Sequence, residues 1–206
     1  MAITFPRGMP DELHVAGLSF ILKPMIEVSP LRSGRLIAAD LGPAIWIGEW
    51  STSILVPAQV GIVRAWFDTL SSLREFYGYD KLRERPVAGF PVGFTGACTL
   101  TSVSAPYGVT LGSLPAGVVL SPGDYLSFDY NSGTNRALHR IAAGGTSAAG
   151  SVTLEVRPEV RSGYAGGAAV SLYRASARML VIPDSYSESL SLPDLSTISF
   201  KAVQSL

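Results

Sequence analysis

The chain has 206 residues, which is enough for one large domain or two small ones. Lys plus Arg and Asp plus Glu number 16 each, so the charge balance gives no electrostatic reason to expect a nucleic acid or an acidic membrane surface as partner. Charged residues make up only 16% of the chain, whereas about 25% is usual for a soluble domain. We therefore expect part of the surface to be covered in an assembly; the alternative is a monomer whose surface is poor in charge.

Membrane insertion is not expected, although 47% of the residues are apolar. The long uncharged run over residues 86–123 is interrupted by prolines and glycines, and its backbone polar groups would be left unpaired in lipid. The first residues, MAITFPRG, lack the apolar core of a secretory signal, so we expect synthesis in the host cytoplasm. The single cysteine, Cys98, excludes an internal disulfide, and its small neighbours suggest a buried strand position.

Four short segments between residues 13 and 50 predict strands, because they are rich in β-forming residues and separated by prolines and glycines. They are LHVAGLSFIL (13–22), PMIEV (24–28), RLIAAD (35–40) and AIWIGEW (44–50). In the last segment, alternation puts Trp46 and Trp50 on one face and Ile45 and Ile47 on the other. Such a strand either lies between two layers or presents one face to another subunit. Trp46 and Trp50 are therefore candidate assembly-interface residues, and a helix-on-sheet core is the alternative.

The segment PAQVGIVRAWFDTLSSLREFYG (57–78) predicts one long helix, at about residues 58–77. Its apolar residues recur at steps of three and four, and Arg64 with Asp68 forms an oppositely charged pair on the other side. Pro57 fits the first turn and Gly78 fits a C-terminal cap. We expect the apolar face to pack on a sheet. This face comprises Val63, Trp66, Phe67, Leu70, Leu73 and Tyr77.

A polar connector follows the predicted helix, and we place a domain boundary near Pro86. Its mixed charges, over residues 81–85, read as a solvated linker and not as a binding patch. From there to about residue 182 the sequence predicts short strands at even spacing without helices, which favours a small barrel or sandwich. The predicted strands are 98–103, 107–111, 117–120, 124–130, 137–142, 151–158, 168–174 and 177–183.

The C-terminal segment returns to alternation, with Ile198, Phe200 and Ala202 on one face. A strand with this pattern has to be paired, and it can rejoin the first domain, which would make the middle unit an insertion. The sequence therefore predicts a mainly β fold with one long helix. A β-rich domain formed by residues 1–85 and 183–206 would carry an inserted small β-barrel, residues 86–182.

The residues do not predict a catalytic set, a metal site or a cofactor. His14 and His139 are the only histidines, and His139 lies beside two arginines in RALHRI, where a satisfied strand residue is expected and a general base is not. GTSAAG (145–150) mimics half of a phosphate loop, but Ser151 stands where a lysine is needed and a strand follows. The potential metal ligands are scattered singly. We therefore do not expect an enzyme.

Aromatic residues of the middle unit leave one binding function open. They could form a platform for a sugar or single-stranded nucleic acid, as small barrels often do. Burial in the barrel core is the competing interpretation, and an exposed ring at the barrel rim would favour a glycan. The residues concerned are Tyr125, Phe128, Tyr130, Tyr164 and Tyr173.

Several short motifs resemble a pattern in tail proteins of long-tailed bacteriophages and related gene transfer particles. A Gly123-Asp124 turn opens a strand, a Leu-x-Arg-Ile-like strand follows at 138–141, and a Gly-led strand runs from Gly150 to Pro158. Upstream, the segment 44–50 and the predicted helix resemble the amino-terminal part of the same proteins. The overall likeness is to the distal tail protein, a ring protein of the tail tip or baseplate.

The resemblance implies a structural virion protein without enzymatic activity. A ring, hexameric in that family, would continue the tail tube at the virion tail tip and connect it to the hub or baseplate. The inserted unit would be an OB-like barrel, from which the last strand returns to the ring-forming domain. The expected partners are copies of the chain, the tube protein and the hub, with no nucleic acid. The alternative function is a carbohydrate-binding module that recognises a bacterial surface glycan.

Overall fold

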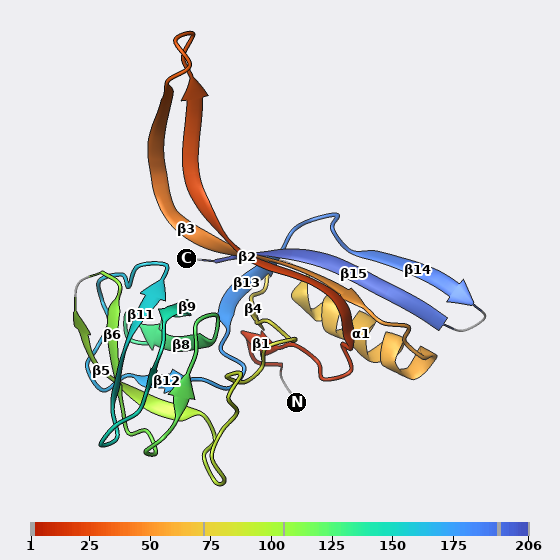
Figure 1. Ribbon diagram of the computed structural model, residues 1–206. Helices are drawn as coiled ribbons and strands as arrows, with labels where there is room; N and C mark the ends of the chain where they lie inside the picture. Colours follow the sequence, from red (N-terminus) through yellow and green to blue (C-terminus); the bar gives the residue numbers. More distant parts are fainter. Residues whose placement is uncertain (1–2, 72, 105, 193–194, 206) are drawn as a thin grey trace.

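The computed structural model describes residues 3–71, 73–104, 106–192 and 195–205. Within these residues the protein consists of one large sheet, one α-helix that lies along it, and one closed barrel (Figure 1). The helix and the barrel lie at opposite ends of the sheet, and a long hairpin projects from the sheet between them. The prediction of a mainly β fold with a single helix is confirmed for this part of the chain.

Seven strands form the large sheet, and they come from both ends of the sequence. They are β1 (Arg7–Gly8), β2 (Val15–Pro30), β3 (Leu36–Thr52), β4 (Phe76–Gly78), β13 (Ala177–Val181), β14 (Ser187–Leu192) and β15 (Leu195–Gln204). The strand order is β1-β4-β13-β15-β3-β2, and β14 pairs with the part of β15 that β13 leaves free. The predicted return of the C-terminal strand is confirmed, because β15 pairs with β3.

The middle of the chain forms a closed barrel of six antiparallel strands. They are β5 (Ala97–Ser104), β6 (Gly108–Gly112), β8 (Tyr125–Tyr130), β9 (Asn135–Ala143), β11 (Val152–Arg157) and β12 (Ala169–Ser171), in the order β11-β6-β5-β12-β8-β9. The barrel closes where β9 pairs with β11. A short ribbon of β7 (Val119–Leu120) and β10 (Gly145–Thr146) lies beside it. The predicted small barrel is therefore present, with one strand more than the five of an OB fold.

The barrel segment ends earlier than expected. The predicted strand 177–183 corresponds to β13, which pairs with β4 and β15 in the large sheet and not with a barrel strand. The boundary expected at residue 182 is thus corrected to a position between β12 and β13. Alternation alone did not distinguish the last barrel strand from the first strand of the returning segment, because both are short and apolar on one face.

The helix is shorter than predicted. α1 spans Pro57–Leu70, and Val60, Val63, Trp66 and Leu70 are buried along it, with Phe67 partly buried against the same core. The hydroxyl groups of Thr69 and Ser71 donate to backbone carbonyls three residues earlier, an arrangement that competes with continuation of the helix. Ser72, within the predicted helix, lies outside the described residues.

The prediction is therefore wrong for two residues of the helical face. Leu73 follows the helix with a φ of 59° and is 77% exposed. Tyr77 lies in β4, where its ring faces the guanidinium of Arg136, while Phe76 beside it is buried in the core. Arg64 also differs from expectation, because it forms a bidentate ion pair with Glu188 of β14.

The core between α1 and the sheet is built from aromatic rings. Trp50 stacks on Phe200 with ring centroids 5.1 Å apart, and Trp66 meets the edge of Phe76 at 5.2 Å. Both indole N–H groups donate to backbone carbonyls, that of Trp50 to Tyr79 and that of Trp66 to Gly8. Because both buried indole N–H groups have hydrogen-bond partners within the chain, the aromatic core is complete without a second subunit.

Trp46 and Trp50 are consequently wrong as assembly-interface candidates. Both side chains are fully buried within the chain. Their predicted shared face is confirmed, but it is the face that packs inward. The alternative that the sequence left open, a helix-on-sheet core, is correct for Trp50. Trp46 instead lies where the sheet meets the barrel.

The barrel is fixed to the sheet by an aromatic cluster around Trp46. Phe20 stacks on Trp46 at 5.2 Å, and Tyr125 of β8 meets the Trp46 ring at 5.7 Å. The indole N–H of Trp46 donates to the carbonyl of Leu138 in β9 at 2.8 Å. Arg140 covers both the Trp46 and the Tyr125 rings. This junction holds the barrel at the base of the projecting hairpin.

The hairpin itself was not predicted. The four short strands expected between residues 13 and 50 are in fact two long strands, β2 and β3, which pair from Val15 with Thr52 to Pro30 with Leu36. Irregularities at Lys23/Met25 and Met25/Ile26 allow the ribbon to continue past the proline and glycines that suggested strand ends.

Candidate functional site: a projecting arm and the groove at its root

The outer half of the β2–β3 hairpin, residues 23–44, is an arm that projects away from the barrel and from α1 (Figure 1). Every residue from 23 to 41 is exposed. A two-stranded ribbon is marginally stable by itself, and monomers rarely expose a large contiguous apolar patch. The arm is therefore a ribbon that exposes large apolar side chains to solvent. Its exposed large apolar residues are Met25, Ile26, Val28, Leu31, Leu36, Ile37 and Leu41.

One face of the arm is apolar along most of its length. Opposed residues in an antiparallel pair share a face, and the register pairs Val28 with Ala38 and Pro30 with Leu36. Ile26 lies on the same face, two residues before Val28, and both side chains are 52% exposed. The opposite face carries Glu27, Ser29, Ile37 and Ala39.

The arm tip, residues 31–36, combines two leucines with two arginines. Leu31 donates its N–H to the carbonyl of Arg35 at 2.8 Å, and Gly34 turns the chain with a φ of 79°. Within the described part of the chain, neither Arg32 nor Arg35 forms an ion pair. The tip therefore presents two unpaired positive charges beside exposed apolar side chains.

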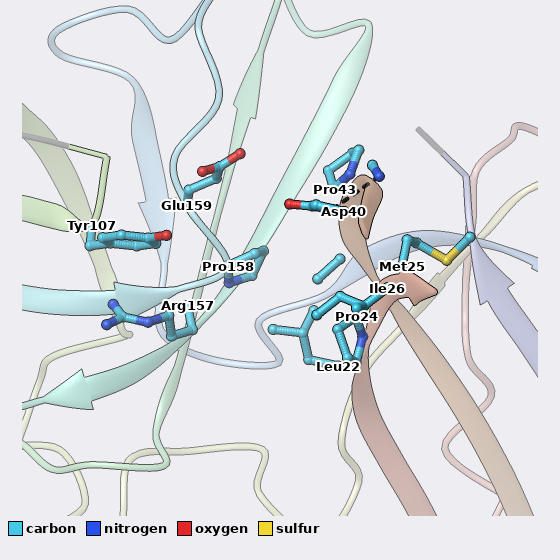
Figure 2. A pocket seen from close by; sticks show the side chains of 12 residues that line it. Leu22, Pro24, Met25, Ile26, Asp40, Pro43, Tyr107, Arg157, Pro158 and Glu159 are labelled. Carbon is cyan, nitrogen blue, oxygen red and sulfur yellow. Dashed lines mark hydrogen bonds between the residues drawn. The ribbon is translucent and has the colours of Figure 1, made fainter. Parts of the chain in front are cut away.

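A groove of about 200 Å³, the root groove, lies between the base of the arm and the barrel (Figure 2). The arm contributes mainly apolar walls, and the barrel contributes the ring of Tyr107 and the segment Arg157–Glu159. The lining residues are Leu22, Pro24, Met25, Ile26, Asp40, Gly42, Pro43, Ala44, Tyr107, Arg157, Pro158 and Glu159. Since Ile26 belongs to the apolar face of the arm, that face leads directly into the groove.

Among the charged groups of the root groove, the carboxylates of Asp40 and Glu159 are the ones without an ion-pair partner in the described residues. The Arg157 guanidinium lies 4.0 Å from the Tyr107 ring centroid and pairs with Glu155 at 2.6 Å, so its charge is already balanced. Asp40 accepts only the N–H of Gly42, at 3.1 Å, among the side-chain hydrogen bonds of the described residues. Neither Asp40 nor Glu159 forms an ion pair within the same residues.

The edges of β2 and β14 are also open. Among the described strands, none pairs with the outer edge of β2, and none pairs with the outer edge of β14. Unpaired edges present rows of backbone donors and acceptors to another chain. The arm, the root groove and these edges are exposed features that sequence reasoning missed. Alternation identified the strands, but it contains no information on which strands extend beyond the core.

The aromatic platform that the sequence left open does not form in the barrel. Tyr125, Phe128 and Tyr130 are buried, at 7%, 2% and 8% exposure, so the competing interpretation of burial is confirmed for three of the five rings. Tyr164 is 38% exposed, and Tyr173 is half-buried with the guanidinium of Arg174 5.3 Å from its ring centroid.

His139 and Cys98 are both buried in the barrel wall. The ring of His139 stacks on Phe128, and its Nδ1 lies 2.9 Å from the carbonyl of Pro158. Burial lowers the pKa of His139 to about 4. Burial likewise raises the pKa of the Cys98 thiol to about 12. Both positions agree with the predicted strand environment.

The described residues contain no helix with the length and apolarity needed to cross a membrane. They also bring together no group of three or more His, Cys, Asp and Glu side chains that could hold a metal ion.

Comparison with protein-family models and with curated proteins gives no match for this chain.

Proposed function

We propose that the protein is a structural component of a bacteriophage tail tip, a distal tail protein that assembles through its arm into a ring. The observation that carries the proposal is the arm, whose apolar face is exposed on a chain with only 16% charged residues. Exposed apolar surface of this kind marks a protein–protein contact. The motif resemblance supplies the identity of the assembly.

The geometry of the arm favours a head-to-tail contact. The arm leaves one side of the molecule (Figure 1), and in the proposed assembly it meets a different surface on the neighbouring copy, so each copy offers one arm and one acceptor surface. Such heterologous contacts give a closed ring when the rotation between copies closes, and a filament when it does not. The ring of the proposed family, a hexamer, is the closed case.

The open strand edges support the same assembly. The long outer edge of β2 can pair with an edge of a neighbouring copy, and the short β14 offers such an edge. Backbone pairing of this kind adds hydrogen bonds and continues the sheet from copy to copy. The ring would then join the tail tube on one side and the hub or baseplate on the other.

Shortening the arm tests this proposal. Replacing residues 27–39 by Asn-Gly would connect Ile26 and Asp40, which already pair, through a two-residue hairpin turn. The purified full chain should form closed multimers in sedimentation velocity and rings in negative-stain images. The shortened variant should remain monomeric with an unchanged thermal unfolding midpoint, since the deleted residues are exposed.

A matched pair of variants locates the contact. Val28→Asp with Leu36→Asp places charges on the apolar face and should reduce assembly. Ser29→Asp with Ala39→Asp places the same charges on the opposite face and should leave assembly largely intact. Monomers of the unmodified chain at every concentration tested would contradict the proposal.

The alternative function, a carbohydrate-binding module, has less support. Three of the five aromatic rings that could form a sugar-binding platform are buried in the barrel. Glycan binding by the purified chain that is lost in Tyr164→Ala, with assembly absent, would favour this alternative.

A further inference from the structure

We propose that the arm tip of one copy docks in the root groove of the next copy, with Arg32 and Arg35 paired to Asp40 and Glu159. This inference rests on the proposed assembly and identifies its acceptor surface. It follows from the match between two exposed features of the chain, a tip that is apolar and positive and a groove that is apolar and negative.

The tip cannot fill the groove of its own chain. The groove includes Ile26, and the tip begins at Leu31, five residues further along a paired strand. At about 3.3 Å per residue the two are roughly 17 Å apart, and a ribbon that is paired along its length does not fold back over this distance. A tip that enters this groove must therefore come from another copy.

The apolar parts of the tip and the groove correspond. Leu31 and Leu36 of the tip are 43% and 63% exposed. The groove offers apolar walls in Leu22, Pro24 and Ile26. Docking would remove apolar surface of both copies from water at once.

The charges also correspond. Two arginines at the tip and two carboxylates in the groove have no ion-pair partner within the described residues. The one cation of the groove, Arg157, is balanced by Glu155. Arginine binds carboxylates with two parallel hydrogen bonds, so pairing would fix the register of the arm on its neighbour.

Two other grooves fit the tip less well. The groove of about 340 Å³ at the end of α1 is apolar, but its charged lining residue is Arg74, which has the same sign as the tip. The groove of about 290 Å³ near His14 contains Asp11 and Glu84, yet both are paired with Arg174. The root groove combines apolar walls with unpaired carboxylates.

Charge exchange between two variants tests the docking. A groove variant carries Asp40→Lys and Glu159→Lys, and a tip variant carries Arg32→Glu and Arg35→Glu. Each alone opposes like charges, so its self-association should weaken by about tenfold or more. An equimolar mixture should assemble again, because every contact between unlike variants then pairs opposite charges. A misfolded variant would not regain assembly on mixing.

A control variant, Glu27→Lys with Asp68→Lys, makes the same charge change on the opposite face of the arm and on α1. It should assemble like the unmodified chain. If the unmodified chain assembles and the shortened arm prevents assembly, but the groove and tip variants each assemble normally, the docking is overturned while the proposed function stands. If the unmodified chain stays monomeric, both fall.

Covalent trapping gives an independent result. Arg35→Cys and Glu159→Cys proteins, mixed under mild oxidation, should give a disulfide-linked dimer of the two different chains. The unmodified chain, whose Cys98 is buried, is the control and should give none. Absence of the mixed dimer in samples that do assemble would count against this acceptor site.

Discussion

The guanidinium of Arg140 lies 4.9 Å from the ring centroid of Trp46 and donates a hydrogen bond to the carbonyl of Phe20 at 3.0 Å. It also donates to the Tyr125 hydroxyl at 2.8 Å. One barrel side chain therefore contacts β2, β3 and β8 where the arm begins. The direction of the arm relative to the barrel, and with it the shape of the root groove, depends on this contact.

Arg140→Leu should destabilise the protein by about 2 kcal/mol, since it removes a cation–π contact and leaves the Phe20 carbonyl without this donor. Urea unfolding followed by tryptophan fluorescence measures the change. Arg85→Leu is the matched control, because Arg85 is exposed and lies over the Tyr173 ring, and its side chain forms no hydrogen bond with the other described residues. A control loss as large as that of Arg140→Leu would contradict this role.

Gly48→Ala should destabilise the large sheet by about 2–3 kcal/mol, as overpacking of a full core does. A Cβ at Gly48 would overlap the indole ring of Trp50. Gly17→Ala is the control on the neighbouring strand, where the added Cβ would lie an ordinary 3.5 Å from Ser51. Differential scanning calorimetry should separate the two variants clearly; equal melting temperatures would show that Trp50 can move aside.

His139 should make the protein less stable in mild acid. Its pKa is about 4 in the folded protein, against 6.5 for a free side chain, because burial disfavours the charged ring. The unfolded chain therefore binds more protons between these values, and stability is lost as the pH falls from about 6.5 to about 4, by up to about 3 kcal/mol. His139→Phe keeps an aromatic ring beside Phe128 and should flatten this part of the pH profile. An unchanged slope in chemical denaturation would refute the assignment.

Cys98 should react with thiol reagents only when the barrel opens. The side chain is 5% exposed and its pKa is raised to about 12, so little thiolate is available at pH 8. Ser102→Cys, on the exposed side of the same strand, should react at once. Labelling rates against urea concentration would then report barrel unfolding, and rapid labelling of Cys98 without denaturant would contradict the buried position.

Sequence periodicity correctly predicted which side chains of α1 and β15 are buried. Val63, Trp66 and Leu70 recur at helical steps and are buried, and Ile198, Phe200 and Ala202 alternate and are buried. The same periodicity continued falsely to Leu73 and Tyr77. The hydroxyl groups of Thr69 and Ser71 donate to backbone carbonyls at the helix end and compete there with the helical hydrogen bonds. The spacing of apolar residues contains no information on this competition.

The exposed arm and the root groove could not be predicted from the sequence for a different reason. Ile26 and Val28 alternate as core residues do, and only the tertiary structure shows that nothing in the described chain covers them. Asp40 and Glu159 meet in one groove because the barrel is fixed at the base of the arm, which depends on Trp46 and Arg140. The sequence correctly predicts that Trp46 lies in a strand, but the prediction that it faces another subunit is wrong, because its side chain is buried within the chain.

The position of β15 between β3 and β13 affects the order in which the parts of the molecule can fold. During translation the barrel strands leave the ribosome as one continuous block and can close before the large sheet has its middle strand. The arm emerges early, but its base stays incomplete until β15, the last of the described strands, has been synthesised. In the proposed assembly, a nascent copy would therefore offer a complete arm base to a neighbour only after β15 has been synthesised.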